Sequence, residues 1–206
     1  MPPSTPPNTR PIPASNPHAL ADAACTQRGF ERFRQVRLGP LVDANGLRDA
    51  ELVFAADIAC YPPALRVTWP KLVYLCAAFP KGVRLYLGES GGAWHPVGYS
   101  AWHPVRPTLL DEPWPDVVTV LEPGEDVRAA YLFNYSVVPS LIGSPLARTV
   151  MCELAADIAG IPMLVADTVS EHGRRAAARW GMSLHTRRLV HGEPWELWAR
   201  RGASPD

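Results

Sequence analysis

A short segment in the second half of the chain has the residue types of an anion-binding loop. An apolar, aromatic-rich run at 129–140 is followed by the loop 141–144 and then by a segment with helical composition. Ser144 suits the N-cap of that helix and Pro145 its first turn. The first N–H groups of a helix have no partner within it, and its dipole favours negative charge there. We therefore predict a phosphate site with N–H donors from Gly143, Ser144, Leu146, Ala147 and Arg148.

Other side chains with useful chemistry cluster in two predicted strands. A general base for an amine needs a pKa near the working pH and a place in a cleft. The residues of these strands that could fill that role, or bind a substrate, are His95, Tyr99, His103, Tyr131, Asn134, Tyr135 and Ser136. For each of them simple packing is the alternative interpretation. We select His103, Tyr135 and Ser136 as the catalytic candidates.

The elements that position these residues follow from periodicity and from breaker residues. Helical patterns lie at 47–62, 69–79, 145–160 and 170–182, and 19–37 is helix-compatible but interrupted by Gly29. Strand patterns lie at 83–90, 95–105, 129–140, 161–169, 183–190 and 194–201. This order predicts an α/β fold in which a mixed sheet carries helices on its faces.

Composition limits the functional classes. The 206 residues carry no net charge, which argues against a nucleic-acid or membrane-surface partner. No apolar run reaches the roughly 18–20 residues needed to span a bilayer, and no signal pattern opens the chain. The four cysteines are scattered, and no Cys/His cluster has metal spacing. The sequence thus favours a cytoplasmic protein with no metal.

Proline distribution divides the chain into two parts. Residues 1–18 are rich in Pro, Ser, Thr and Asn, which predicts a disordered arm. The rest, 19–206, is long enough for one core and is predicted to be a single domain. Arg makes up most of the basic residues, which we interpret mainly as a bacterial-like composition bias.

The run Val137-Val138-Pro139-Ser140-Leu141-Ile142-Gly143-Ser144-Pro145-Leu146-Ala147 resembles a motif of the GCN5-related N-acetyltransferase (GNAT) superfamily. In that family a strand ends in V-x-P-x-[YF]-[RQ]-G-x-G-x-[GA], and a helix begins within the motif. The order of elements over 47–200 resembles the family as well. The resemblance implies a mixed, mostly antiparallel central sheet flanked by helices, and a coenzyme A site.

The resemblance also implies roles for named residues. The diphosphate of an acyl-coenzyme A, bound as co-substrate, would lie on the loop 142–148, with Arg148 adding a charge-assisted contact. The N–H groups of Val137 and Val138 would polarise the thioester carbonyl at an opening beside the central strand. The resulting cofactor-binding set is Val137, Val138, Ile142, Gly143, Ser144, Leu146, Ala147 and Arg148.

Two departures from the family pattern affect the expected chemistry. Ile142 stands where the family has Arg or Gln, and Pro145 replaces a glycine and removes one N–H donor. Ala177 stands where the family often has a tyrosine acid, and Ala129 or Ala130 falls near its usual glutamate base. The acid and the base must then come from elsewhere.

Two functional classes follow. The first is an N-acyltransferase that moves an acetyl or acyl group from acyl-coenzyme A to an amine of a small molecule or an amino-acid-like acceptor. The second is a repurposed fold with different chemistry, with transfer from a carrier protein, or with a binding or regulatory role. The acidic loop 111–126 could attract a cationic amine or could simply be solvated. The sequence leaves the oligomeric state open, a homodimer included.

Overall fold

The computed structural model describes residues 16–26, 29–39, 44–111, 121, 127–190 and 193–202. Its helices are α1 (Pro17–Thr26), α2 (Ala44–Cys60), α3 (Trp69–Ala78), α4 (Pro145–Asp157) and α5 (Glu171–Arg179). Its strands are β1 (Arg32–Arg37), β2 (Val83–Ser90), β3 (Ala93–Pro104), β4 (Ala129–Val137), β5 (Met163–Thr168), β6 (Ser183–Val190) and β7 (Glu193–Arg201). Short 3-10 turns occupy Pro63–Leu65, Pro80–Gly82, Pro107–Asp111 and Pro139–Leu141.

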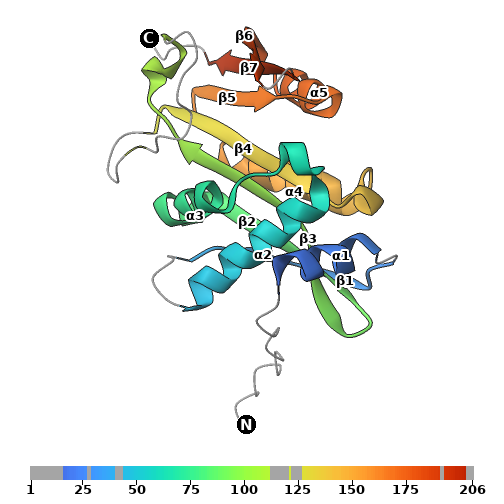
Figure 1. Cartoon of the computed structure of the whole chain (residues 1–206). Coiled ribbons are helices and arrows are strands. Elements are labelled where there is room, and N and C mark those ends of the chain that lie inside the picture. The colour runs from blue at the N-terminus through green and yellow to red at the C-terminus, as the bar shows by residue number, and fades with distance from the viewer. Residues whose placement is uncertain are drawn as a thin grey trace, which may run out of the picture.

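The strands form one seven-stranded sheet in the order β1-β2-β3-β4-β5-β7-β6. Every neighbouring pair is antiparallel except β4 and β5, which are parallel and are joined through α4. The predicted mixed, mostly antiparallel sheet with helices on its faces is therefore confirmed (Figure 1). The two predicted hairpins are confirmed as β2–β3 and β6–β7.

The helices cover the two faces of the sheet in separate groups. A core cluster joins α2 and α3 to one face of β2 and β3 through Val53, Leu72, Leu85, Tyr99 and their neighbours. A second cluster joins α4 and α5 to the other face through Leu132, Leu154, Leu164, Ala177 and their neighbours. Figure 1 shows α1, α2 and α3 together in front of the strands. The sheet thus has an α2/α3 face and an α4/α5 face.

The N-terminal part of the domain differs from the sequence prediction. The segment 19–37, predicted as an interrupted helix, contains α1 and then the edge strand β1. Gly29, between α1 and β1, has the left-handed φ of +86°, and β1 gains its backbone partners by pairing with β2. In 32–37 the backbone hydrogen bonds to β2 outweigh the local preference for helix.

The predicted arm and the acidic loop fall largely outside the described residues. Helix α1 begins at Pro17, inside the segment predicted as an arm, and 1–15 is not described. Of the loop 111–126 the structure describes Asp111 and Leu121.

Candidate active site

Strands β4 and β5 separate beyond a short paired region. Their pairs are Ala129↔Met163, Ala130↔Leu164 and Tyr131↔Val165. Beyond these pairs β4 continues to Val137 and β5 to Thr168, and β5 takes all its further partners from β7. Residues 132–137 of β4 therefore face an opening in the sheet, which we call the splay.

The start of α4 lies just after the end of β4 and matches its prediction. Ser144 is the N-cap, and its Oγ accepts a hydrogen bond from the N–H of Ala147 at 3.3 Å. Pro145 occupies the first turn. Gly143 has φ +80°, a left-handed conformation that costs a glycine little. These residues fix a sharp turn from the strand into the helix.

Most N–H groups of this turn already have acceptors within the protein. Ile142 donates to the Pro139 carbonyl, Ser144 to the Leu141 carbonyl and Arg148 to the Ser144 carbonyl. Ala147 donates to its cap, as above. Among the described residues, the N–H groups of Gly143 and Leu146 donate to no protein acceptor. Two free donors at a helix N-terminus are a reduced anion site compared with the five predicted.

The N–H groups of the two valines at the end of β4 point in opposite directions. Val138 donates to the Val97 carbonyl of β3 at 2.8 Å, so its N–H is already used. Because successive N–H groups in a strand point to opposite edges, those of Val137 and Tyr135 are directed away from β3 and toward the splay. Val137 is thus the one of the two that can polarise a carbonyl there.

A β-bulge in β4 decides which side chains reach which face. The register passes from Ala101↔Asn134 to Trp102↔Leu132, which leaves Phe133 as an extra residue in β4. Leu132 and Tyr135 consequently share the α4/α5 face, although they are three residues apart. Asn134 and Ser136 lie on the opposite, α2/α3 face, where they meet side chains from α2.

The three catalytic candidates occupy different places. Tyr135 is half-buried on the α4/α5 face and stacks on Trp180, with ring centroids 5.9 Å apart. Burial raises the pKa of its phenol, and the nearby Arg179 partly opposes this. Ser136 accepts a hydrogen bond from Asn134 Nδ2 at 3.1 Å on the other face. His103 is 2% exposed and packs on Tyr131 beside the closed end of the splay. The structure therefore does not bring the three together.

A group of four residues meets on the α2/α3 face, and of these only Tyr131 was named from the sequence. Phe133 and Tyr131 come from β4, Asp167 from β5 and Lys71 from α3. The Tyr131 hydroxyl donates to Asp167 Oδ1 across the splay. The Lys71 ammonium lies 5.4 Å from the centroid of the Phe133 ring. We call these residues the α3-face cluster.

Asp167 is the titratable centre of the α3-face cluster. Burial raises the pKa of its carboxyl, while the Tyr131 hydroxyl, the Lys71 ammonium and the Arg188 guanidinium favour the charged form. A carboxylate with a raised pKa at the edge of an opening can accept a proton from an ammonium group. The sequence did carry a signal, because Asp167 is the one charged residue in the otherwise buried run of β5.

A buried polar network supports the same face from α2. Asp57 is 2% exposed and accepts hydrogen bonds from the Tyr99 hydroxyl at 2.7 Å and from the Val67 N–H at 2.9 Å. Burial raises the pKa of its carboxyl. Tyr61, which follows α2, donates its hydroxyl to Asn134 Oδ1. The network holds the chain after α2 against the splay.

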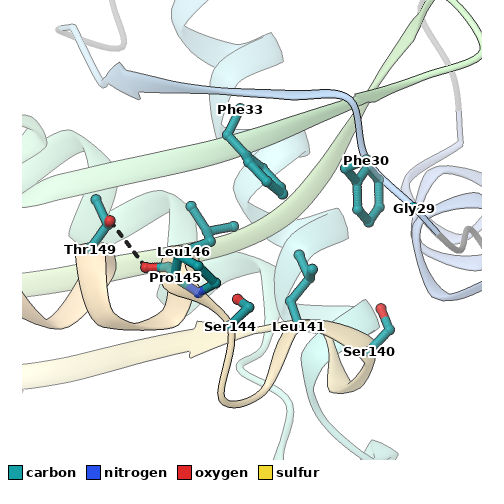
Figure 2. Close-up of a pocket in the computed structure, with 9 residues that line it drawn as sticks. All are labelled: Gly29, Phe30, Phe33, Ser140, Leu141, Ser144, Pro145, Leu146 and Thr149. Carbon is teal, nitrogen blue, oxygen red and sulfur yellow. Dashed lines mark hydrogen bonds between the residues drawn. The ribbon is translucent and has the colours of Figure 1, made fainter.

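A cavity of about 780 Å³ lies between the start of α4 and the residues 29–33 at the beginning of β1. Figure 2 shows Phe30, Phe33, Leu141 and Leu146 turned toward one another around it. The hydroxyl-bearing residues Ser140, Ser144 and Thr149 also line it. The cavity is not in the splay, but it shares Ser144 and Leu146 with the anion site. It can take an apolar or planar group attached to a bound phosphate.

Two further properties concern the described residues only. They contain no group of three or more His, Cys, Asp and Glu side chains arranged to hold a metal ion. Within the same part of the chain, no helix combines the length and the apolar character required to cross a bilayer.

Comparison with known proteins gives matches in structure and none in sequence. No protein-family model and no curated protein matches the chain. The loading GNATL domain of CurA from Lyngbya majuscula is similar at a TM-score of 0.60 and 14% identity, over 83% of this chain and 98% of that domain. The GphF GNAT-like decarboxylase, solved with isobutyryl-CoA, has a TM-score of 0.58 and 13% identity, with 83% and 99% covered.

An N-acetyltransferase is also similar. The ribosomal-protein-S18-alanine N-acetyltransferase from Escherichia coli has a TM-score of 0.51 and 12% identity, with 85% of this chain and 97% of that one covered. At such identities the likeness establishes the fold and not the reaction. The chain has the fold of the GCN5-related N-acetyltransferases.

Proposed function

We propose that the protein is an N-acyltransferase that uses acyl-coenzyme A and acylates a primary amine. The observation that carries this proposal is the splay, which opens beside the first turn of α4. A pantetheine arm could lie along the free edge of β4 while the diphosphate meets the N–H groups of Gly143 and Leu146. The adjoining cavity is large enough for the adenosine end, with Phe33 as a stacking surface.

The proposed reaction divides its work between the two faces of β4. Asp167 accepts a proton from the acceptor's ammonium group on the α2/α3 face. The neutral amine attacks the thioester carbonyl, a C–N bond forms, and the negative charge on the oxygen is stabilised by the Val137 N–H. The C–S bond then breaks, the nitrogen loses its second proton to solvent to give the amide, and the thiolate leaves on the α4/α5 face. Tyr135 is placed to donate a hydrogen bond to that sulfur, and solvent supplies its proton.

Ligand binding and turnover test the proposal together. Coenzyme A and acetyl-coenzyme A should stabilise the protein by about 2.7 kcal/mol when present at about a hundred times their dissociation constant. Thiol release from acetyl-coenzyme A should then depend on an added primary amine. An unchanged melting temperature at millimolar coenzyme A would refute the proposal.

A second candidate is acyl chemistry on a carrier protein, including decarboxylation of the acyl group. Two observations favour it. The anion site retains only two free N–H donors, and a carrier-bound phosphopantetheine needs one phosphate rather than a nucleotide diphosphate. The names of the CurA and GphF domains refer to loading and to decarboxylation. Stronger binding of phosphopantetheine than of coenzyme A would favour this candidate.

A further inference from the structure

The ammonium of Lys71 lies close to residues of both strands that border the splay. It is 5.4 Å from the ring centroid of Phe133 on β4, and it acts electrostatically on Asp167 of β5. Lys71, Phe133 and Asp167 are all half-buried, so a small solute can reach them. Lys71 is therefore a cation held at the place where an acceptor amine would meet an acyl group.

Lys71 forms no ion pair with the described residues. Among the described residues, no carboxylate lies within ion-pair distance of its ammonium, and the Tyr131 hydroxyl occupies one oxygen of Asp167. The π-face of Phe133 compensates a partly desolvated ammonium only in part. A cation in such a position is well suited to a substrate anion.

Two arginines also act electrostatically on carboxylates of this face. The guanidinium groups of Arg66 and Arg188 act on Asp57 and Asp167 respectively. Asp57 already accepts two hydrogen bonds inside the buried network. In the part of the chain that the structure describes, Asp167 is thus the carboxylate at the splay that can meet a cationic group, and Lys71 is the matching cation.

We infer that the acceptor is an α-amino acid, whose ammonium group meets Asp167 and whose carboxylate binds Lys71. This inference rests on the proposed acyl transfer at the same site. An α-amino acid carries an ammonium group and a carboxylate on the same carbon atom. The α3-face cluster offers a carboxylate, Asp167, and an ammonium group, Lys71, to pair with them. An amine without a carboxylate would leave Lys71 unpaired.

Matched acceptors provide the main experiment. Each proteinogenic amino acid is compared with the amine that lacks its carboxylate, for example phenylalanine with phenethylamine, in wild type and in Lys71→Met. The variant should lower kcat/KM for the amino acid by about tenfold to a hundredfold, mainly through KM. It should leave the weaker reaction of the amine unchanged, and Lys71→Arg should recover part of the loss.

The chain offers a close control. Lys81 also lies over a phenylalanine ring, 4.9 Å from the centroid of Phe79, but away from the splay. Lys81→Met should therefore leave both acceptors unaffected. If Lys71→Met lowered kcat/KM equally for the amino acid and for the amine, the role of Lys71 would be structural and the inference would be overturned.

The remaining outcomes separate this inference from the proposed function. If coenzyme A does not bind wild type, acyl transfer fails, and thermal shift with amino acids alone still tests Lys71. If coenzyme A binds but no amino acid is acylated or bound, only the acceptor assignment is overturned. If Lys71→Met weakens malonyl-coenzyme A relative to acetyl-coenzyme A but spares the amino acid, the carboxylate belongs to the acyl group and the inference is wrong.

Discussion

The two faces of β4 differ in how their functional groups are assembled. On the α4/α5 face most of the groups come from one continuous segment, which runs from the end of β4 through the turn into α4, and Phe33 of β1 is added to them. On the α2/α3 face they come from α2, α3, β4 and β5, which are far apart in the chain. The first face has features that suit a cofactor, and the second has features that suit an acceptor.

The bulge at Phe133 makes this division. In a regular strand, Leu132, Asn134 and Ser136 would share a face with one another. The extra residue instead places Leu132 with Tyr135 on the apolar side and Asn134 with Ser136 on the polar side. One inserted residue therefore separates the proposed cofactor side of β4 from the proposed acceptor side. If the two faces act separately, a substitution on the α4/α5 face should leave acceptor binding unchanged. A substitution on the α2/α3 face should leave coenzyme A binding unchanged.

The largest expected effect is that of Asp167→Asn. The variant should lower the turnover of an amine by about 10²–10⁴-fold, because the base is lost, while coenzyme A still binds. The wild-type rate should rise with pH through the raised pKa of Asp167, and this rise should disappear in the variant. Steady-state kinetics over a pH series measures both. Asp111→Asn, at an exposed carboxyl, should behave as wild type.

On the cofactor side of the molecule, the substitution to test is Phe33→Ala, at the cavity beside α4. Loss of a stacking ring at the cavity should weaken coenzyme A about tenfold and leave phosphopantetheine unchanged. Phe33 is 43% exposed, so its removal should cost little stability. Calorimetric titration of both ligands is the measurement, with Leu189→Ala, at a 73% exposed leucine, as the control. If Phe33→Ala weakened the binding of both ligands equally, the nucleotide of coenzyme A would not lie on Phe33.

Two helix caps allow a stability effect to be separated from a binding effect. Ser144 caps α4 and Ser170 caps α5, where its Oγ accepts from the Gly173 N–H at 3.0 Å. Replacing either serine by alanine should lower the free energy of unfolding by about 1 kcal/mol. Only Ser144→Ala should also weaken coenzyme A. Denaturant unfolding and ligand titration of both variants would show whether the turn into α4 holds the cofactor.

The smallest expected effect concerns the pH dependence of stability. Because burial raises the pKa of Asp57 in the folded state, its contribution is fully present below the unfolded value of about 3.9 and is lost as pH rises through the folded value. Asp57→Asn should remove this component from the unfolding free energy measured in urea over a pH series. Asp22→Asn should retain it. If the unfolding free energies of wild type and Asp57→Asn changed with pH in the same way, the raised pKa of Asp57 would be contradicted.

Local elements were predictable where local chemistry determines them. The start of α4 follows from Ser144 and Pro145, since capping and a fixed φ act within one turn. The hairpins follow from alternation and from glycine turns. The edge strand β1 was missed because its stability comes from pairing with β2, which lies about fifty residues away along the chain.

The candidate site was predictable only in part. The turn into α4 was predicted, but the number of N–H groups that remain free in 142–148 depends on acceptors in the folded turn. His103 was selected for its chemistry, yet its strand buries it beside the closed end of the splay.

By itself, the sequence determined the order of the main helices and strands from α2 onward, the turn into α4 and the absence of net charge, because each depends on neighbouring residues or on composition. Tertiary structure decided the splay, the bulge and the electrostatic interaction of Lys71 with Asp167. These features arise from register and from the packing of distant segments, and both are fixed by the energy of the whole core rather than by any local pattern.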